Sequence, residues 1–279
     1  DHLEAHGSPE HYLASKAQLF MALPPTGTAI LNGCDETAPL LAEIVPRGVK
    51  TLFYGSRTRG PAALALDLEA TGIDVNWHGT TVRLHSALPL GIRTLHLPAI
   101  GAVYAENALA ALLAARVAGV APADAAHAIA TCPLVPGRFE VVRRRPYAVV
   151  DYAHTPDALR RVLTTARALC KGRLTVVFGA GGDRDRSKRA AMGAAASVCD
   201  RIVLTNDNPR SEAPMAIIEA LRAGIESASA VEIELERARA IALALGQARD
   251  EDVIVVAGKG HETDAQGQSD ASLVRRALP

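Results

Sequence analysis

The second half of the chain alternates short apolar runs with longer helical patterns, and this alternation restricts the possible folds more than any other feature. Runs rich in valine, isoleucine and leucine are expected to form strands at 140–144, 147–152, 174–178, 201–205, 231–235 and 253–257. Helical patterns lie between most of them, at 156–170, 187–199, 214–225 and 236–248. Strands and helices in this order predict a mostly parallel sheet covered on both faces. The expected fold class is therefore α/β.

The first half follows a different pattern. Short strands are expected at 28–34 and 50–55, and helices at about 37–45, 106–118 and 122–132. Between them, residues 73–99 alternate polar and apolar side chains, which predicts antiparallel hairpins that turn at His78-Gly79 and Pro89–Gly91. The segment CPLVPG at 132–137 is dense in residues that break regular structure. We therefore predict two domains, 1–132 and 133–279.

Composition narrows the possible partners. The 279 residues include 30 basic and 30 acidic side chains, and this balance argues against a nucleic-acid or membrane-surface partner. No uncharged apolar stretch approaches ~20 residues, so no membrane-spanning helix is expected. The four cysteines are scattered without metal-ligand spacing, which is typical of buried thiols in a reducing compartment.

A glycine-rich loop follows the expected strand at 174–178. Gly179, Gly181 and Gly182 allow a sharp turn and a close approach to a ligand. A strand that ends in glycines and leads into a helix is suited to holding an anion. Position 184 is an arginine, so the G-x-G-x-x-G dinucleotide fingerprint is incomplete. An ordinary loop with a solvated charge cluster is the alternative interpretation.

Polar residues follow the other expected strands too, and the carboxyl ends of parallel strands form the usual ligand-binding edge. These residues are Asp151, His154, Asn208, Arg210 and 259–262. Arg184, Arg210 and Lys259 are suited to a carboxylate or phosphate. Asn208 and Glu262 are suited to an ammonium group. Together they predict a site for a zwitterionic amino acid, unless the charges pair with one another on the surface.

Two further residues are suited to a nucleotide. A carboxylate at the end of a strand, such as Asp151, can accept hydrogen bonds from ribose hydroxyls. Arg138, at the expected domain junction, is suited to a nucleotide phosphate. At the start of the chain, His2, His6 and His11 stand among acidic residues and form either a metal site or a polar surface.

Taken together, the motifs identify a resemblance. They are DHLEAHG, ASKA, NALAA, VPGRFEVV, VVDYAHTPDAL, GAGGDRDRSKR, LTNDNPRSE and AGKGHE. In this order they resemble the Mur ligases, and more narrowly the MurE type, the UDP-N-acetylmuramoyl-tripeptide synthetases. The resemblance runs from Asp1 to about Glu262. It implies the latter part of a central ATPase domain followed by a Rossmann-like domain.

The resemblance also implies a reaction, in the cytoplasm, that builds a peptidoglycan precursor. ATP phosphorylates the terminal carboxylate of UDP-MurNAc-L-Ala-D-Glu, and the amino group of a diamino acid attacks the acyl phosphate. The implied nucleotide-binding residues are Asn107, Arg138, Asp151 and His154. The implied amino-acid pocket consists of Arg184, Asn208, Arg210, Gly258 and Glu262. The sequence DNPR at 207–210 resembles the version that accompanies meso-diaminopimelate.

The implied cofactors are ATP and Mg²⁺. By resemblance, His2 is a magnesium ligand and Lys16 is a lysine that becomes carbamylated, because a carbamate offers magnesium an oxygen and an ammonium does not. Without the resemblance, Lys16 would be read as a solvated helix lysine.

The sequence departs from the family pattern in three places. No G-x-x-G-K-T phosphate loop is present, Tyr104 replaces the first of two paired asparagines, and Thr263 replaces an aromatic residue after GHE. A truncated ligase that is inactive as an isolated chain is one expectation, since ATP phosphates need such a loop. The alternative is a non-catalytic module that binds a diamino acid or a partner protein. Folylpolyglutamate synthetase shares the plan, but DNPR and GKGHE weigh against it, and the glycine pattern weighs against a dehydrogenase.

Overall fold

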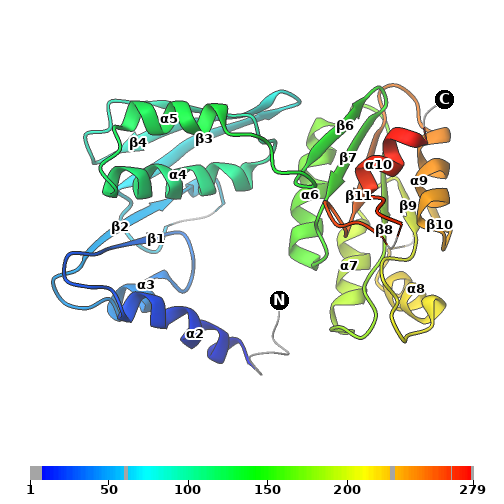
Figure 1. The fold of residues 1–279 in the computed structure, drawn as a ribbon, viewed down its shortest axis with the longest axis horizontal. Coiled ribbons are helices and arrows are strands. Elements are labelled where there is room, and N and C mark those ends of the chain that lie inside the picture. The colour runs from blue at the N-terminus through cyan, green and yellow to red at the C-terminus, as the bar shows by residue number, and fades with distance from the viewer. Residues whose placement is uncertain (1–7, 60–61, 227–229, 265, 278–279) are drawn as a thin grey trace. The chain divides into compact units, whose positions relative to one another are not determined.

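The computed structural model describes residues 8–59, 62–226, 230–264 and 266–277. The chain divides into two compact units, 1–133 and 134–279, and the described residues form one sheet in each (Figure 1). The boundary expected from the sequence, between Cys132 and Pro133, lies one residue before this division. No described helix is long and apolar enough to cross a membrane.

The first unit begins with a helix and then builds a mixed sheet. Its elements in order are α2 (Pro9–Met21), β1 (Thr28–Asn32), α3 (Ala38–Glu43), β2 (Lys50–Gly55), η1 (Arg57–Arg59), β3 (Leu68–Asn76), β4 (Gly79–Ser86), β5 (Thr94–Leu97), α4 (Ala102–Val117) and α5 (Pro122–Thr131). The strand order is β1-β2-β3-β4-β5, parallel from β1 to β3 and antiparallel from β3 to β5. The two expected hairpins are thereby confirmed.

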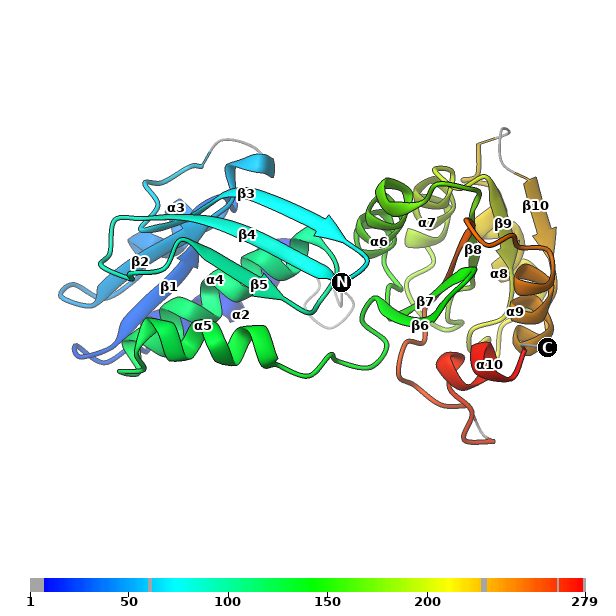
Figure 2. The same ribbon diagram turned by 90° about the horizontal axis from the view of Figure 1, so that it is seen from above.

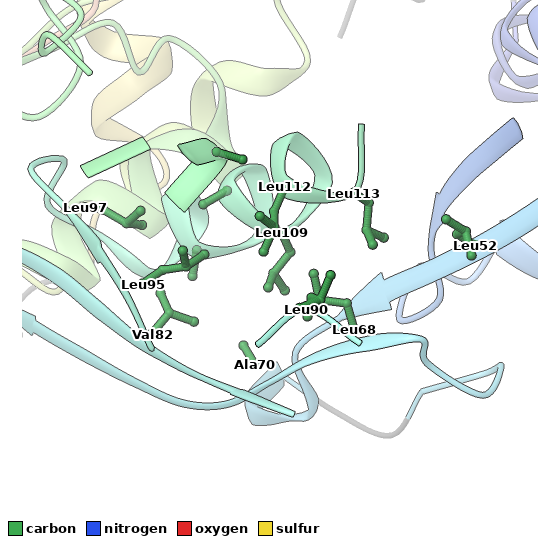
Figure 3. Packing of buried hydrophobic residues seen from close by; sticks show 13 residues of the cluster. Leu52, Leu68, Ala70, Val82, Leu90, Leu95, Leu97, Leu109, Leu112 and Leu113 are labelled. Atoms are coloured by element: carbon green, nitrogen blue, oxygen red, sulfur yellow. The ribbon is translucent and has the colours of Figure 1, made fainter. Parts of the chain in front are cut away.

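Helix α4 provides the apolar face that covers this sheet. Leu109, Leu112 and Leu113 are fully buried and pack over the leucine and valine side chains of the strands (Figure 3). Full burial of each such side chain stabilises the fold by roughly 1.5–3 kcal/mol. These leucines recur at helical spacing along α4, and their packing holds the helix on the sheet.

The second unit alternates strands and helices. Its elements are β6 (Glu140–Arg144), β7 (Tyr147–Asp151), α6 (Pro156–Leu169), β8 (Leu174–Phe178), α7 (Lys188–Ala196), β9 (Arg201–Leu204), α8 (Pro214–Arg222), β10 (Ala230–Ile233), α9 (Arg237–Gly246), β11 (Val253–Ala257) and α10 (Asp270–Arg276). The strand order is β10-β9-β8-β11-β7-β6, and only the β6–β7 pair is antiparallel. The expected mostly parallel α/β sheet is confirmed.

Helices cover both faces of this second sheet. Helices α6 and α7 lie on one face, with α8 beside α7, and α9 and α10 lie on the other (Figure 2). Strands β8 and β11 are buried along their whole length, as expected for central strands of a two-sided parallel sheet. Because β11 lies between β7 and β8, loops that are far apart in sequence meet at the carboxyl edge.

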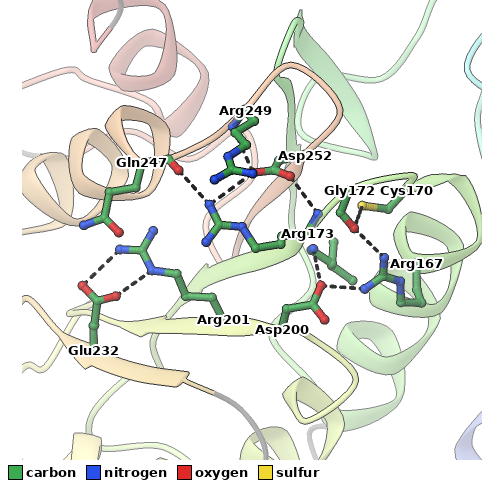
Figure 4. Close-up of polar contacts among 11 residues, drawn as sticks. Arg167, Cys170, Gly172, Arg173, Asp200, Arg201, Glu232, Gln247, Arg249 and Asp252 are labelled. Carbon is green, nitrogen blue, oxygen red and sulfur yellow. Dashed lines mark hydrogen bonds and ion pairs between the residues drawn. The ribbon is translucent and has the colours of Figure 1, made fainter.

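The amino edge of the second sheet is closed by charged groups. Asp200 accepts hydrogen bonds from the Leu174 backbone and from Arg167, both at 2.7 Å (Figure 4). Asp252 accepts one from the Arg173 backbone at 2.8 Å, and Arg201 pairs with Glu232 at 2.6 Å. These contacts satisfy the polar groups where the strands begin, so the charged side chains at this edge have a structural role.

Two elements differ from expectation. Strand β3 begins at Leu68, five residues before the expected start of alternation, because a bulge between Ala70 and Gly72 interrupts the two-residue period. Helix α4 begins at Ala102, four residues early, after Gly101 with a φ of 136°. The sequence pattern does not show either feature, since both depend on local backbone geometry.

Candidate ligand-binding site

The carboxyl ends of β7, β8, β9 and β11 bring together loops that carry most of the predicted site residues. Within the second unit these strand ends and loops supply Asp151, His154, Arg184, Asn208, Arg210, Gly258 and Glu262, and Arg138 reaches the same edge from the segment that precedes β6, the strand antiparallel to β7. Parallel pairing places these loops on one edge, so the predicted amino-acid pocket and three of the four predicted nucleotide residues share it.

The glycine loop after β8 and the DNPR loop after β9 are in direct backbone contact. The Gly182 amide donates to the Asn208 carbonyl at 2.8 Å, and the Arg210 guanidinium donates to the Gly182 carbonyl. A Cβ atom on Gly182 would collide with the Pro209 carbonyl. Glycine is therefore required at position 182 by the close approach of the second loop.

Carboxylates reinforce this junction. Asp183 accepts hydrogen bonds from the Ser211 amide at 3.0 Å and the Ser211 hydroxyl at 2.8 Å, and these bonds lower its pKa. Glu212 accepts one from the Asp183 amide at 2.7 Å and two from the buried Arg189, at 2.7 and 3.0 Å. Arg189, followed by the Asp183 amide, lowers the pKa of Glu212 to about 2. Both carboxylates are therefore ionised at neutral pH.

Arg210 and Asp183 have unusual backbone conformations. Their φ angles are 48° and 51°, in the left-handed region that non-glycine residues seldom occupy. Both side chains belong to the junction between the two loops, so its contacts hold them there. The Arg210 side chain is exposed and has further N–H groups beyond the one on Gly182, so it can accept an anionic ligand. Arg184 is exposed as well.

The loop after β11 is held against β7. The Gly258 amide donates to the Asp151 carbonyl at 3.1 Å, and Gly258 has a φ of 119°. Further along, the Tyr152 hydroxyl donates to Glu262 at 2.8 Å, and this hydrogen bond raises the pKa of Tyr152. Glu262 is exposed with its second oxygen available for an ammonium group.

Arg138 and Asp151 lie near each other at the open end of the β6–β7 hairpin, where the amide of Phe139, next to Arg138, donates to Asp151. The Arg138 guanidinium carbon is 4.7 Å from the centre of the Tyr152 ring, a cation–π contact that leaves its N–H groups at the surface. Asp151 is 5% exposed and accepts hydrogen bonds from the Phe139 and Ala153 amides at 2.7 and 2.8 Å. Burial raises its pKa, against the effect of those two bonds. Each oxygen keeps a lone pair for a hydroxyl donor.

His154 is turned toward its own loop. Its Nδ1 is 2.9 Å from the Tyr152 carbonyl, and its ring meets the Tyr152 ring edge-on at 4.7 Å. This arrangement holds the imidazole against the ring of Tyr152, over which Arg138 also lies.

The first unit holds the remaining predicted residues. Asn107 lies exposed on α4, and Lys16 lies exposed on α2 with its Nζ 5.3 Å from the Tyr12 ring centre. His2 lies outside the described residues. Within the described ranges, no three histidine, cysteine or carboxylate side chains gather to hold a metal ion. The magnesium site expected from His2 and Lys16 stays a prediction, because His2 lies outside the described residues.

The site belongs to an α/β protein that gathers charged and glycine-rich loops at a parallel-sheet edge. Two known protein families match this chain. The Mur ligase middle domain matches residues 1–115, and the Mur ligase glutamate ligase domain matches residues 137–260. The chain belongs to the Mur ligase family. The resemblance carried by the sequence motifs is confirmed.

The names of individual relatives specify one type of enzyme within the family. The UDP-N-acetylmuramoyl-L-alanyl-D-glutamate–2,6-diaminopimelate ligase of Thermosynechococcus vestitus is 42% identical over 267 residues, covering 94% of this chain and 52% of the relative. The enzyme of that name from Coxiella burnetii is 39% identical, covering 94% and 54%. The chain thus spans about half the length of these curated relatives.

Solved structures agree on the fold. A structure of a 2,6-diaminopimelate ligase of that name matches with a TM-score of 0.63 and 35% identity, over 99% of this chain and 57% of the other. MurF ligase from Thermotoga maritima, solved with ADP, matches with a TM-score of 0.70 at 18% identity, over 99% and 58%. The second similarity supports the fold alone.

Sequence reasoning did not find the supporting residues of the site. The sequence alone assigns no role to Arg189, Glu212 or Tyr152, although each of them contacts a predicted residue or its loop. A signal for Arg189 was present: it precedes Met192, Gly193 and Ala196 at helical spacing, which places it on the buried face of α7. No local pattern indicates that Glu212 is its partner.

Proposed function

We propose that this chain supplies the amino-acid-binding part of an ATP-dependent amide ligase that adds meso-diaminopimelate to UDP-MurNAc-L-Ala-D-Glu. The single observation that carries the proposal is the DNPR loop, whose Arg210 is anchored on Gly182 beside Arg184 and Asn208. The names of the relatives that match 94% of the chain support the same substrates.

In this proposal, the cationic side chains of the site bind the distal carboxylate of the amino acid. The guanidinium of Arg210 pairs with that carboxylate, because Arg offers two parallel N–H groups to a planar anion. Glu262, held by Tyr152 on the neighbouring loop, receives the ammonium group. A diamino acid with two carboxylates therefore suits the site better than lysine does.

The nucleotide is assigned to the residues around Tyr152. Arg138 presents its cation at the surface and is suited to a phosphate, and Asp151 can accept ribose hydroxyls. Bound ATP would supply the phosphoryl group that activates the carboxylate. Asn107, Lys16 and His2 remain predictions for the nucleotide and Mg²⁺, and no step is assigned to the metal. The proposal places the reaction in the cytoplasm, with the first unit as the latter part of the ATPase domain.

Calorimetric titration tests the amino-acid assignment. The chain is titrated with meso-diaminopimelate and with L-lysine, before and after Arg210→Ala. The proposal expects selective binding of meso-diaminopimelate that the substitution abolishes. Binding of both ligands with equal affinity, unchanged by Arg210→Ala, would contradict it.

The alternative is a non-catalytic module with the same pocket. Pocket loops in a chain whose sequence contains no G-x-x-G-K-T are compatible with both functions. ADP release distinguishes the two. Release that depends on UDP-MurNAc-L-Ala-D-Glu would show that the chain is active, whereas binding of the diamino acid without ADP release would favour the module.

A further inference from the structure

Residues 208–212 and 181–183 form a ladder of contacts between two loops that leave neighbouring strands. Asn208 and Arg210 bond to the Gly182 backbone, and Ser211 bonds to Asp183. Glu212 completes the ladder by accepting the Asp183 amide. The ladder therefore sets the position of Asn208 and Arg210 relative to the glycine loop.

Glu212 is the only member of this ladder that is tied to the buried interior through a charge. Its carboxylate is 9% exposed and meets the guanidinium of Arg189, which is 3% exposed. Arg189 also donates to the Gly181 carbonyl at 3.3 Å. Arg189 thus joins helix α7, the glycine loop and the DNPR loop at one point.

Both oxygens of Glu212 act only as acceptors. Oε1 receives the Asp183 amide and one Arg189 N–H, and Oε2 receives a second Arg189 N–H and pairs with Arg186 at 3.2 Å. A glutamine amide cannot satisfy all of these donors, because its nitrogen is itself a donor. The Nε atom of Arg189 already has no partner, alone among the buried side-chain nitrogens and oxygens of the described residues. Glu212 accepts two of the three hydrogen bonds that the guanidinium donates, and Gly181 accepts the third, so Glu212 is its main orienting partner.

We propose that Glu212, held by Arg189, is a positioning residue that sets the amino-acid selectivity of the site by aiming Arg210 at a second carboxylate. This inference rests on the proposed function for the identity of the ligand. Arg210 and Asp183 occupy strained left-handed conformations, so loss of the ladder releases them to relax. Relaxation turns Arg210 away from the distal carboxylate but leaves the rest of the pocket, which lysine also uses, unchanged.

The test compares Glu212→Gln with Glu219→Gln, which makes the same chemical change on the exposed surface of α8. In calorimetry, Glu212→Gln should lower the affinity for meso-diaminopimelate about tenfold, because a charge-assisted contact is lost. The affinity for lysine should change by less than about twofold. Glu219→Gln should match the unsubstituted chain. Equal weakening of both ligands, or no weakening, would overturn the proposal.

Amide hydrogen exchange separates this inference from the proposed function. If the unsubstituted chain binds neither ligand, the amino-acid assignment fails, and exchange still tests the ladder. Glu212→Gln should then lose protection at the Asp183 and Ser211 amides while the β8 and β11 amides stay protected. Loss of exchange protection across the whole sheet would show that Glu212 has a general structural role, and it would overturn the proposal.

A milder variant covers the case in which Glu212→Gln fails to fold. Asp183→Asn removes the charge that accepts the two Ser211 bonds while leaving Glu212 and Arg189 paired. Asparagine tolerates the left-handed conformation at position 183. The same selective loss of meso-diaminopimelate binding is expected, and unchanged selectivity would count against the ladder.

Discussion

Arg237 and Asp270 form an ion pair with two hydrogen bonds, each 2.7 Å long, beneath the loops of the candidate site. Arg237 is 9% exposed and Asp270 is 1% exposed. The same guanidinium donates to the Ala257 carbonyl at 2.9 Å and the Asn206 carbonyl at 3.4 Å. It therefore ties together the ends of β9 and β11, the strands that lead into the DNPR and GKGHE loops.

Asp270→Asn should destabilise the second unit by about 3–5 kcal/mol, because it leaves the buried Arg237 charge uncompensated. Urea denaturation followed by circular dichroism measures the change. Removing both charges, as in Arg237→Met with Asp270→Leu, should cost less than the sum of the single changes. The exposed pair Arg239–Glu236 is the control, and Arg239→Gln, which leaves Glu236 to cap α9, should lose little of the pair's roughly 0–1 kcal/mol. Additive losses at Arg237 and Asp270 would contradict a coupled pair.

Gly182→Ala should separate the two site loops, because the added methyl group collides with the Pro209 carbonyl. We expect a loss of amino-acid binding together with a lower melting temperature. Gly246→Ala is the matched control, since nothing lies within 4 Å of the new Cβ atom there. That change should be neutral or stabilising by about 0.4–1 kcal/mol. Similar effects from both substitutions would argue against a close approach at Gly182.

Acid should weaken the fold partly through Glu212. Its pKa falls from an ordinary 4.5 to about 2 on folding, chiefly through Arg189. The folded state therefore binds this proton less readily than the unfolded state, so the contribution to stability is complete above pH 4.5 and is lost as pH falls toward 2. Urea unfolding as a function of pH should show a shallower decline for Glu212→Gln over this range. Glu219→Gln should keep the slope of the unsubstituted chain, and parallel curves for all three proteins would show that Glu212 does not titrate as stated.

Tyr152→Phe removes the hydroxyl that holds Glu262 but keeps the ring beneath Arg138. We expect the affinity for the diamino acid to fall about tenfold, as for loss of a hydrogen bond to a charged group, with nucleotide affinity unchanged. Calorimetry with each ligand separately measures the difference. A larger loss of nucleotide than of amino-acid affinity would assign Tyr152 to the nucleotide instead.

Leu109→Ala should destabilise the first unit by about 2–5 kcal/mol, because Leu109 is fully buried between α4 and the sheet. Thermal unfolding should show the loss, while amides of β8 and β11 keep their exchange protection. Leu40→Ala, at an exposed position, should change stability by less than about 0.5 kcal/mol. Loss of protection in β8 would mean that the two units unfold together.

The sequence by itself determined the local elements and the motif-bearing loops. The apolar runs at 174–178 and 253–257 became β8 and β11 with those bounds, because buried central strands require continuous β-branched and aliphatic residues. Periodicity also placed Asp151, Asn208 and Gly258 at or just beyond strand ends, where parallel strands form a ligand-binding edge. These properties depend on neighbours within a few residues.

Only the tertiary structure decided the strand order and the pairing of charges. Insertion of β11 between β7 and β8 brings Glu262 to Tyr152, 110 residues away. Contact of the DNPR loop with α7 pairs Glu212 with Arg189. Helical spacing places Arg189 on the buried face of α7, but sequence alone does not select the carboxylate that meets it. That choice depends on how α7 packs on the sheet and on which carboxylate lies opposite, because a buried charge is stable only where the fold supplies its partner.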